Sequence, residues 1–156
     1  MIYNKIKVGV IGLGYLGKFH YQKYKANRHA SLVAVVDTND ENINKLESNK
    51  VIKTNDYREL IGIVDAVSIV TPTTTHYKLA KFFLENKIHV LLEKPMTETV
   101  GQAKSLNAIA KKNKRVLQIG HLEQFNPAIR KLKLDSVKPQ FIEVHRLCKF
   151  NPRAND

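Results

Sequence analysis

The sequence predicts an α/β fold with a doubly wound, mostly parallel sheet. Short β-branched apolar runs alternate with stretches of helical periodicity along the first 120 residues. A glycine-rich turn follows the first apolar run, and an aspartate closes the second. Runs that are apolar throughout are typical of strands buried on both faces of a parallel sheet.

The first predicted strand covers residues 5–11 and ends in glycine. A helix is expected next, with an inward face formed by residues at helical spacing, namely Leu16, Phe19, His20 and Tyr24. Membership of that face would make His20 a structural residue. Asn27 is a plausible end for the helix.

The middle of the chain repeats the alternation of strand and helix. Residues 32–37 predict the second strand, residues 38–40 the cap of a weak helix through residue 50, and residues 51–53 the third strand. Residues 56–61 allow one or two helical turns. The fourth strand, residues 66–70, is followed by Pro72, which ends it.

The alternation continues with a helix at residues 76–86, a strand at 89–92, a helix from Thr97 and a sixth strand at 116–119. The remaining residues differ, with a turn at Asn126-Pro127, a short helix, and an alternating run at 140–147 that predicts a strand of another sheet. We therefore expect a nucleotide-binding domain at 1–120. Residues 121–156 would form a linker helix and the first strand of an incomplete C-terminal substrate domain.

The formal net charge of +12 raises the alternative of nucleic-acid binding. The lysines are scattered, however, and the densest basic run, residues 111–115, falls at a predicted helix end, where cations complement the helix dipole. We expect neither a nucleic-acid nor a membrane partner, and a homo-oligomer is left open. One cysteine, Cys148, and the lack of a leader or long apolar run predict a cytoplasmic protein.

The motif Gly12-Leu13-Gly14-Tyr15-Leu16-Gly17 lies between a predicted strand and a predicted helix, which is the context of a dinucleotide-binding turn. The first glycine permits the tight turn, the second lets the backbone approach a pyrophosphate, and the third lets the helix lie close to the strand. Gly12, Leu13, Gly14, Tyr15 and Leu16 are therefore candidate cofactor-binding residues of a Rossmann domain.

Asp37 stands about 20 residues after the glycines, at the end of the second predicted strand. Its carboxylate would accept hydrogen bonds from the adenosine ribose hydroxyls and repel a 2′-phosphate, so NAD is favoured over NADP. A competing interpretation is that Asp37 caps the second helix.

Two further segments follow predicted strands at the same sheet edge. Thr71, Pro72 and Thr73 are expected to contact the nicotinamide half of the cofactor, whereas His76 is either a cofactor contact or a capping and packing residue. Glu93-Lys94-Pro95 offers a lysine that could donate to a substrate hydroxyl or the nicotinamide ribose, or relay a proton. The alternative is a solvated Glu-Lys turn rigidified by proline.

The segments GVIGLGYLG, TPTTTH and EKP together resemble the Gfo/Idh/MocA family of sugar-type oxidoreductases in order and spacing. This resemblance implies an N-terminal nucleotide-binding domain joined to a C-terminal open-sheet domain that binds the substrate. It also implies that Lys94 lies in the active site as the catalytic candidate, with Glu93 among the cofactor-binding residues.

The segments GHLEQFNPA and IEVHRLCKFNPR resemble the subgroup that acts on UDP-N-acetylglucosamine at the sugar 3-hydroxyl, although Gln124 stands where that subgroup usually has arginine. Family members continue for about another domain's length, and their catalytic histidine lies there. No residue after Arg146 matches it. The sequence thus predicts either an NAD-dependent sugar or nucleotide-sugar oxidoreductase in its full form, or a catalytically inactive dinucleotide-binding fragment, which we favour for the chain as given.

Overall fold

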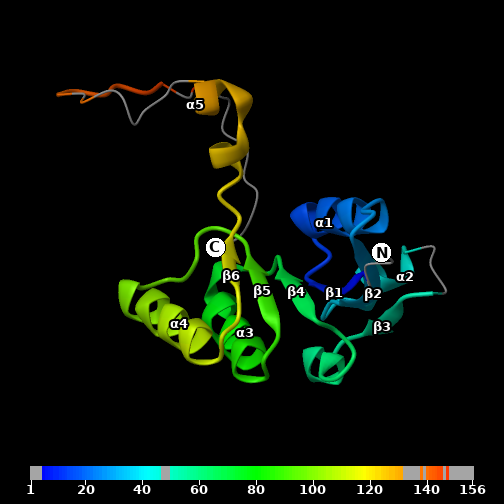
Figure 1. Ribbon diagram of the computed structural model, residues 1–156. Coiled ribbons are helices and arrows are strands. Elements are labelled where there is room, and N and C mark those ends of the chain that lie inside the picture. The colour runs from blue at the N-terminus through cyan, green and yellow to red at the C-terminus, as the bar shows by residue number, and fades with distance from the viewer. Residues whose placement is uncertain (1–4, 47–49, 132–137, 139, 146, 148–156) are drawn as a thin grey trace. The chain divides into compact units, whose positions relative to one another are not determined.

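The computed structural model describes residues 5–46, 50–131, 138, 140–145 and 147. The chain divides into two compact units, residues 1–120 and residues 121–156, and each is described by itself. Figure 1 shows the first unit as a sheet with helices packed on it.

The first unit is built on a six-stranded sheet in the order β3-β2-β1-β4-β5-β6, in which every neighbouring pair is parallel. The strands are β1 (Ile6–Ile11), β2 (Ala30–Val36), β3 (Ile52–Thr54), β4 (Ala66–Ile69), β5 (His89–Leu92) and β6 (Leu117–Ile119). The predicted doubly wound fold is confirmed. The strand order reverses direction between β1 and β4, and such a switch point opens a crevice at the carboxyl ends of the strands.

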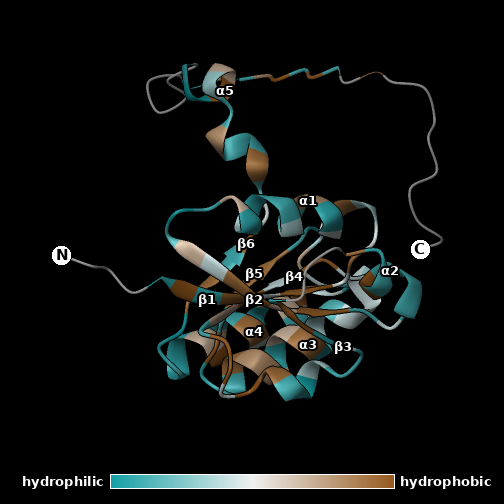
Figure 2. Ribbon diagram, turned by 90° about the vertical axis from the view of Figure 1, so that its right-hand side faces the viewer, coloured by the Kyte–Doolittle hydropathy of each residue, from teal (hydrophilic) through white to brown (hydrophobic). Residues whose placement is uncertain are grey.

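Helices cover both faces of this sheet (Figure 2). They are α1 (Tyr15–Lys25), α2 (Asp40–Asn44), the 3₁₀ helix η1 (Tyr57–Leu60), α3 (Thr73–Glu85) and α4 (Val100–Lys112). On one face, Tyr21 of α1 and Ile43 of α2 pack with Val10 and Val35 of the strands. On the other, α3, α4 and η1 enclose the larger core around Phe83. Alternate residues of β1 and β2 point to opposite cores, which explains their unbroken apolar character.

The inward face of α1 differs from the predicted one. Leu16 and Phe19 are 43% and 48% exposed, and the buried residues of the helix are Gly17 and Tyr21. Gly17 is the point of closest approach, since a Cβ there would lie 1.9 Å from the carbonyl oxygen of Gly12. The buried stripe therefore runs along the i, i+4 row through Gly17 and Tyr21, and Leu16 and Phe19 fall beside it.

Three predicted helix boundaries also change. Helix α4 begins at Val100 rather than at Thr97, because Thr99 is its N-cap residue and accepts from the Gln102 N–H. Helix α3 begins at Thr73 rather than at His76, because Pro72 serves as its N-cap residue and Thr75 donates to the Pro72 carbonyl at 2.8 Å. Helix α2 ends at Asn44, and residues 47–49 of the expected longer helix lie outside the described residues.

The second unit contains the 3₁₀ helix η2 (Leu122–Phe125) and the short helix α5 (Pro127–Lys131). The strand expected at residues 140–147 is not present at 140–145 or 147, and residue 146 lies outside the described residues. The pattern of alternation was correct for a strand, but a strand also needs a hydrogen-bonded neighbour, and the described residues pair none with it.

Candidate functional site

A cleft of about 460 Å³ opens beside the switch point of the sheet, at the carboxyl ends of β1, β2 and β4. Its walls combine apolar side chains with backbone from the glycine turn and a few polar groups, as small-molecule sites usually do. The lining residues are Ile11, Gly12, Gly14, Val36, Asp37, Thr38, Asn42, Asn55, Tyr57, Val70, Thr71, Pro72, Thr75, Lys78 and Leu79.

The three glycines of the turn differ in what an added Cβ atom would meet. Gly12 has a φ of +88°, and a Cβ there would lie 2.7 Å from the carbonyl oxygen of Val70. Gly17 lies against Gly12, as described above. A Cβ at Gly14, by contrast, would meet no atom of the chain within 4 Å. The fold therefore does not require glycine at position 14, whereas close approach by a ligand would.

The helix N-termini at the cleft lack side-chain caps. Gly14 caps α1 and Pro72 caps α3, neither provides a side-chain hydrogen bond, and neither helix has an acidic residue in its first turn. Elsewhere Asn39, Asp56 and Thr99 cap α2, η1 and α4. The free N–H groups and positive dipole ends of α1 and α3 thus suit an anionic ligand in the cleft.

Asp37 organises the glycine turn from the end of β2. Its Oδ2 accepts a hydrogen bond from the Leu13 N–H at 2.6 Å, and its Oδ1 accepts one from the Asn39 N–H at 2.8 Å. The interpretation of Asp37 as the cap of α2 is wrong, because Asn39 is the N-cap residue and accepts from the Glu41 N–H at 2.9 Å. Each carboxylate oxygen of Asp37 retains a lone pair for a ligand hydroxyl.

The structure brings five of the twelve candidate residues into the wall of the cleft: Gly12, Gly14, Asp37, Thr71 and Pro72. Leu13 is buried with its side chain in the core, and it contributes to the site through its N–H group alone. Tyr15 and Leu16 are exposed on the first turn of α1, and Thr73 opens α3.

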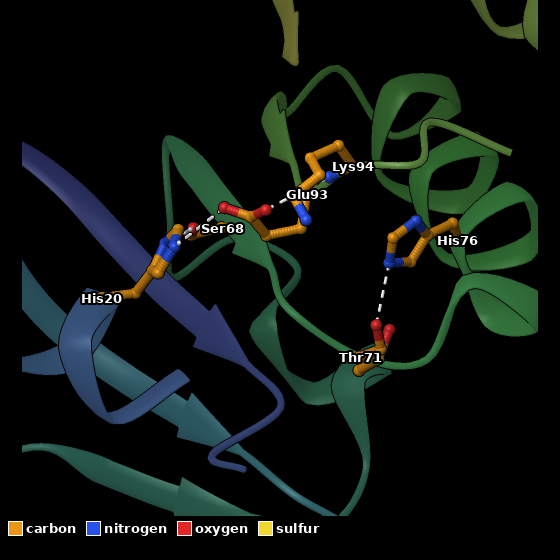
Figure 3. Close-up of polar contacts among 6 residues, drawn as sticks. All are labelled: His20, Ser68, Thr71, His76, Glu93 and Lys94. Carbon is orange, nitrogen blue, oxygen red and sulfur yellow. Dashed lines mark hydrogen bonds and ion pairs between the residues drawn. The ribbon is translucent and has the colours of Figure 1, made fainter. Parts of the chain in front are cut away.

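His76 is neither a helix cap nor part of the wall of the cleft. It is 1% exposed, and its Nε2 and Nδ1 lie 2.8 Å and 2.9 Å from the carbonyl oxygens of Thr71 and Pro95. Figure 3 shows it between the two loops. His76 therefore ties the loop after β4 to the loop after β5.

Glu93 and Lys94 do not form a solvated turn. Glu93 is only 6% exposed, and its carboxylate oxygens face the Nε2 of His20 and the Lys94 N–H, each at 3.2 Å. Lys94 is exposed, and the Lys94–Pro95 peptide bond is cis. The two side chains thus separate, with the acid turned into the protein and the lysine outside the core (Figure 3).

Residues 6–121 match the protein family described as "Oxidoreductase family, NAD-binding Rossmann fold", the Gfo/Idh/MocA oxidoreductases. The chain belongs to this family. Over 153 residues it is 38% identical to the UDP-N-acetylglucosamine 3-dehydrogenase of Acidithiobacillus ferrooxidans, covering 97% of this chain and 48% of that protein. The chain thus spans about half the length of this Gfo/Idh/MocA relative.

Solved structures of family members share the fold. The crystal structure of the Acidithiobacillus ferrooxidans enzyme matches with a TM-score of 0.78 and 37% identity, covering 85% of this chain and 44% of that one. The scyllo-inositol dehydrogenase of Lactobacillus casei, solved with NAD(H) and scyllo-inositol, matches with a TM-score of 0.77 and 25% identity, covering 84% and 40%. The first unit of the chain is thus an NAD-binding Rossmann domain of the Gfo/Idh/MocA family.

Several residues of this Gfo/Idh/MocA site were not predicted from the sequence. Thr75, Lys78 and Leu79 present one face of α3 to the cleft, and their i, i+3, i+4 spacing was the available signal. Asn55 and Tyr57 enter from the segment after β3, and no local pattern marked them. Asn55 donates to the carbonyl oxygen of Asp37 at 2.9 Å, so it belongs to the same loop cluster.

Hydrogen bonds and burial shift the pKa values of an acid and a phenol in the first unit. The side-chain hydrogen bond from Arg58 lowers the pKa of Asp56, the residue that caps η1. Burial raises the pKa of the Tyr24 phenol, and its hydrogen bond with Ser68 opposes that rise.

Within the described ranges no cluster of three or more His, Cys, Asp or Glu side chains could hold a metal ion. None of the helices in those ranges has both the length and the apolar content needed to cross a membrane.

Proposed function

We propose that the chain binds NAD in the switch-point cleft, as the cofactor-binding part of a protein that in its full form transfers a hydride between NAD and a hydroxyl of a sugar or nucleotide sugar. The observation that carries this proposal is the space beside Gly14 at the uncapped N-terminus of α1, where the fold leaves room that it does not itself require. Family membership and the NAD(H)-bound relative support the same ligand.

The residues of the cleft fit the parts of a dinucleotide. The N–H groups at Gly14 and along the first turn of α1 would bind the pyrophosphate, and Asp37 would accept from the adenosine ribose hydroxyls. Apolar side chains of Val36 and Leu79 would contact the adenine. The loops at Thr71 and Lys94 would then lie towards the nicotinamide.

When bound, NAD supplies the acceptor or donor of a hydride. Lys94 would supply the accompanying proton chemistry, because an ammonium or amine at the end of β5 can hydrogen-bond a substrate hydroxyl and relay its proton. The exposure of Lys94 and the inward orientation of Glu93 support this assignment, since no carboxylate of the same tripeptide neutralises the lysine.

A Gly14→Val substitution tests cofactor binding. We expect the thermal midpoint to change little, because a Cβ at this position would meet no atom of the chain within 4 Å. We expect NAD affinity, measured by calorimetry, to fall by at least about tenfold as the side chain occupies the pyrophosphate position. Unchanged NAD affinity would contradict the proposal, and duplex DNA binding with a steep inverse salt dependence would support the nucleic-acid alternative.

An Asp37→Asn substitution tests the preference for NAD over NADP. The wild-type chain should bind NAD at least about tenfold more tightly than NADP, because the carboxylate repels a 2′-phosphate. The asparagine is the same size and keeps one acceptor oxygen without the charge, so the ratio of the two dissociation constants should approach one. A ratio that is the same in both proteins would remove Asp37 from the selection of cofactor.

A panel of substrates tests the reaction and distinguishes the substrate classes. The purified chain is incubated with NAD and either UDP-N-acetylglucosamine or scyllo-inositol, and NADH is followed by its absorbance. We propose a nucleotide sugar, since the UDP-N-acetylglucosamine enzyme is 38% identical over 97% of the chain, whereas an inositol 2-dehydrogenase of Rhizobium meliloti is 29% identical over 96%. NADH formed with scyllo-inositol alone would assign a free polyol instead. NAD binding without turnover on any of the panel would favour the inactive dinucleotide-binding module.

A further inference from the structure

A buried polar network joins the cofactor-binding helix to the loop that carries Lys94. The Nδ1 of His20, on α1, lies 2.7 Å from the Oγ of Ser68, and its Nε2 lies 3.2 Å from Oε1 of Glu93. Ser68 is fully buried in the middle of β4, and Glu93 follows β5. Three segments that are distant in the sequence thus meet at one imidazole ring (Figure 3).

The hydrogen bonds of the network can all point in one direction. Because the Glu93 carboxylate can only accept, Nε2 of His20 donates to it, and Nδ1 is then free to accept from the Ser68 hydroxyl. Tyr24, also on α1, shares a hydrogen bond with Ser68. With Nε2 as donor and Nδ1 as acceptor, His20 satisfies both of its partners, and the donors run from Ser68 through His20 to Glu93.

The network ends on the backbone of Lys94. The second oxygen of Glu93 accepts from the Lys94 N–H at 3.2 Å, so one carboxylate faces both His20 and the lysine's peptide. Gly120 makes room for this carboxylate, because a Cβ there would lie 2.8 Å from Oε1 of Glu93. The carboxylate is thus held on two sides and confined on a third.

We propose that His20 is a positioning residue that fixes the Glu93 carboxylate and thereby sets the orientation of Lys94 relative to the dinucleotide-binding helix α1. The position of His20 on α1 is what gives the network this role, since the same helix presents its N-terminus to the cleft. The orientation of Lys94 towards the nicotinamide rests on the proposed function. The contact of His20 with the Glu93 carboxylate, and through it with the Lys94 N–H, does not depend on the proposed function.

Amide hydrogen exchange of the full chain, followed by NMR without any ligand, tests that contact. In His20→Ala we expect the Lys94 amide to exchange about tenfold faster, because its acceptor is no longer fixed. The Glu93 amide is the internal control, since it donates to the Ile69 carbonyl at 3.0 Å within the sheet and should keep its protection. Unchanged protection of Lys94 would overturn the proposal, and so would equal loss at both amides, which reports general destabilisation.

Two further variants separate positioning from packing. His20→Gln can still donate to Glu93 and should restore most of the Lys94 protection. Glu93→Gln replaces one acceptor oxygen with an N–H donor, so it should weaken either the His20 contact or the Lys94 contact while preserving shape. The proposal fails if the Lys94 amide exchanges as fast in His20→Gln as in His20→Ala and as slowly in Glu93→Gln as in wild type. Hydrogen bonding would then not be the cause of its protection.

NADH titration then tests the consequence for the site. We expect NADH affinity in His20→Ala to stay within about threefold of wild type, because the glycine turn is intact. The shift of the Lys94 amide resonance at NADH saturation should fall to less than half of its wild-type size. If the Lys94 amide resonance of His20→Ala shifts as far as that of wild type, His20 does not set the orientation of Lys94 relative to α1. Failure of wild-type protein to bind NADH would instead refute the proposed function, and the exchange result without ligand would still decide the role of His20.

Discussion

Gly17→Ala is expected to destabilise the chain by about 3 kcal/mol, the upper end of the usual range for overpacking, and to abolish measurable NAD binding. The added methyl group would stand 1.9 Å from the carbonyl oxygen of Gly12, which is backbone and cannot rotate away. Helix α1 must therefore move off β1, which separates its N-terminus from the glycine turn. Urea unfolding measures the first effect, and calorimetry with NAD measures the second.

Gly101→Ala is the matched control for this substitution. Gly101 is exposed in the first turn of α4, and the nearest atom to its added Cβ is the Oγ1 of Thr99 at 3.8 Å. Alanine there should stabilise the chain by up to about 1 kcal/mol, because it restricts the unfolded backbone and favours the helix. If both alanines have the same effect on stability and on NAD binding, close packing of α1 on the turn is not what the third glycine provides.

Phe83→Ala is expected to cost about 3–5 kcal/mol, the second large effect. Phe83 is fully buried at the centre of the larger core, and its ring packs edge-on against Tyr57 and Phe82. Truncation leaves a cavity under η1, and Tyr57 from that helix lines the cleft. The free energy of unfolding in urea should therefore fall, and NAD affinity should fall with it.

Phe82→Ala provides the comparison, since Phe82 is the neighbouring ring on α3 but is only half-buried. Its loss should cost about 2 kcal/mol or less, because part of its surface is already in contact with water. Equal destabilisation by the two alanines would show that the depth of burial does not govern the strength of packing in this core.

The strands and the glycine turn could be predicted because their signals are local. Each parallel strand is buried on both faces, so its residues must be apolar throughout, and Gly12 follows from a backbone turn with positive φ. The acidic residue at the end of β2 was equally local. Its two acceptor contacts to Leu13 and Asn39 could not be predicted, because they depend on how the two loops meet.

Helix faces were predicted less well where backbone contact, rather than apolar side chains, decides the packing. Leu16 and Phe19 have the spacing of a buried face, yet the helix approaches the sheet through Gly17, whose close packing the glycine motif predicted and the apolar spacing did not. The strand expected at residues 140–147 had a correct alternation but no partner among the described residues. In both cases the apolar periodicity alone did not show the deciding contact.

The sequence by itself determined the fold class and the dinucleotide-binding turn, because buried parallel strands and tight turns restrict residue type at each position. Lys94 became the catalytic candidate only through the resemblance to the Gfo/Idh/MocA family. Only the tertiary structure decided what surrounds Lys94. It turned Glu93 inward to His20, placed His76 between two loop carbonyls, and brought Tyr57 to the cleft. These contacts join segments that are far apart in the chain. They could not be predicted from the sequence, because the partner of a polar side chain depends on which strands and loops become neighbours when the sheet assembles.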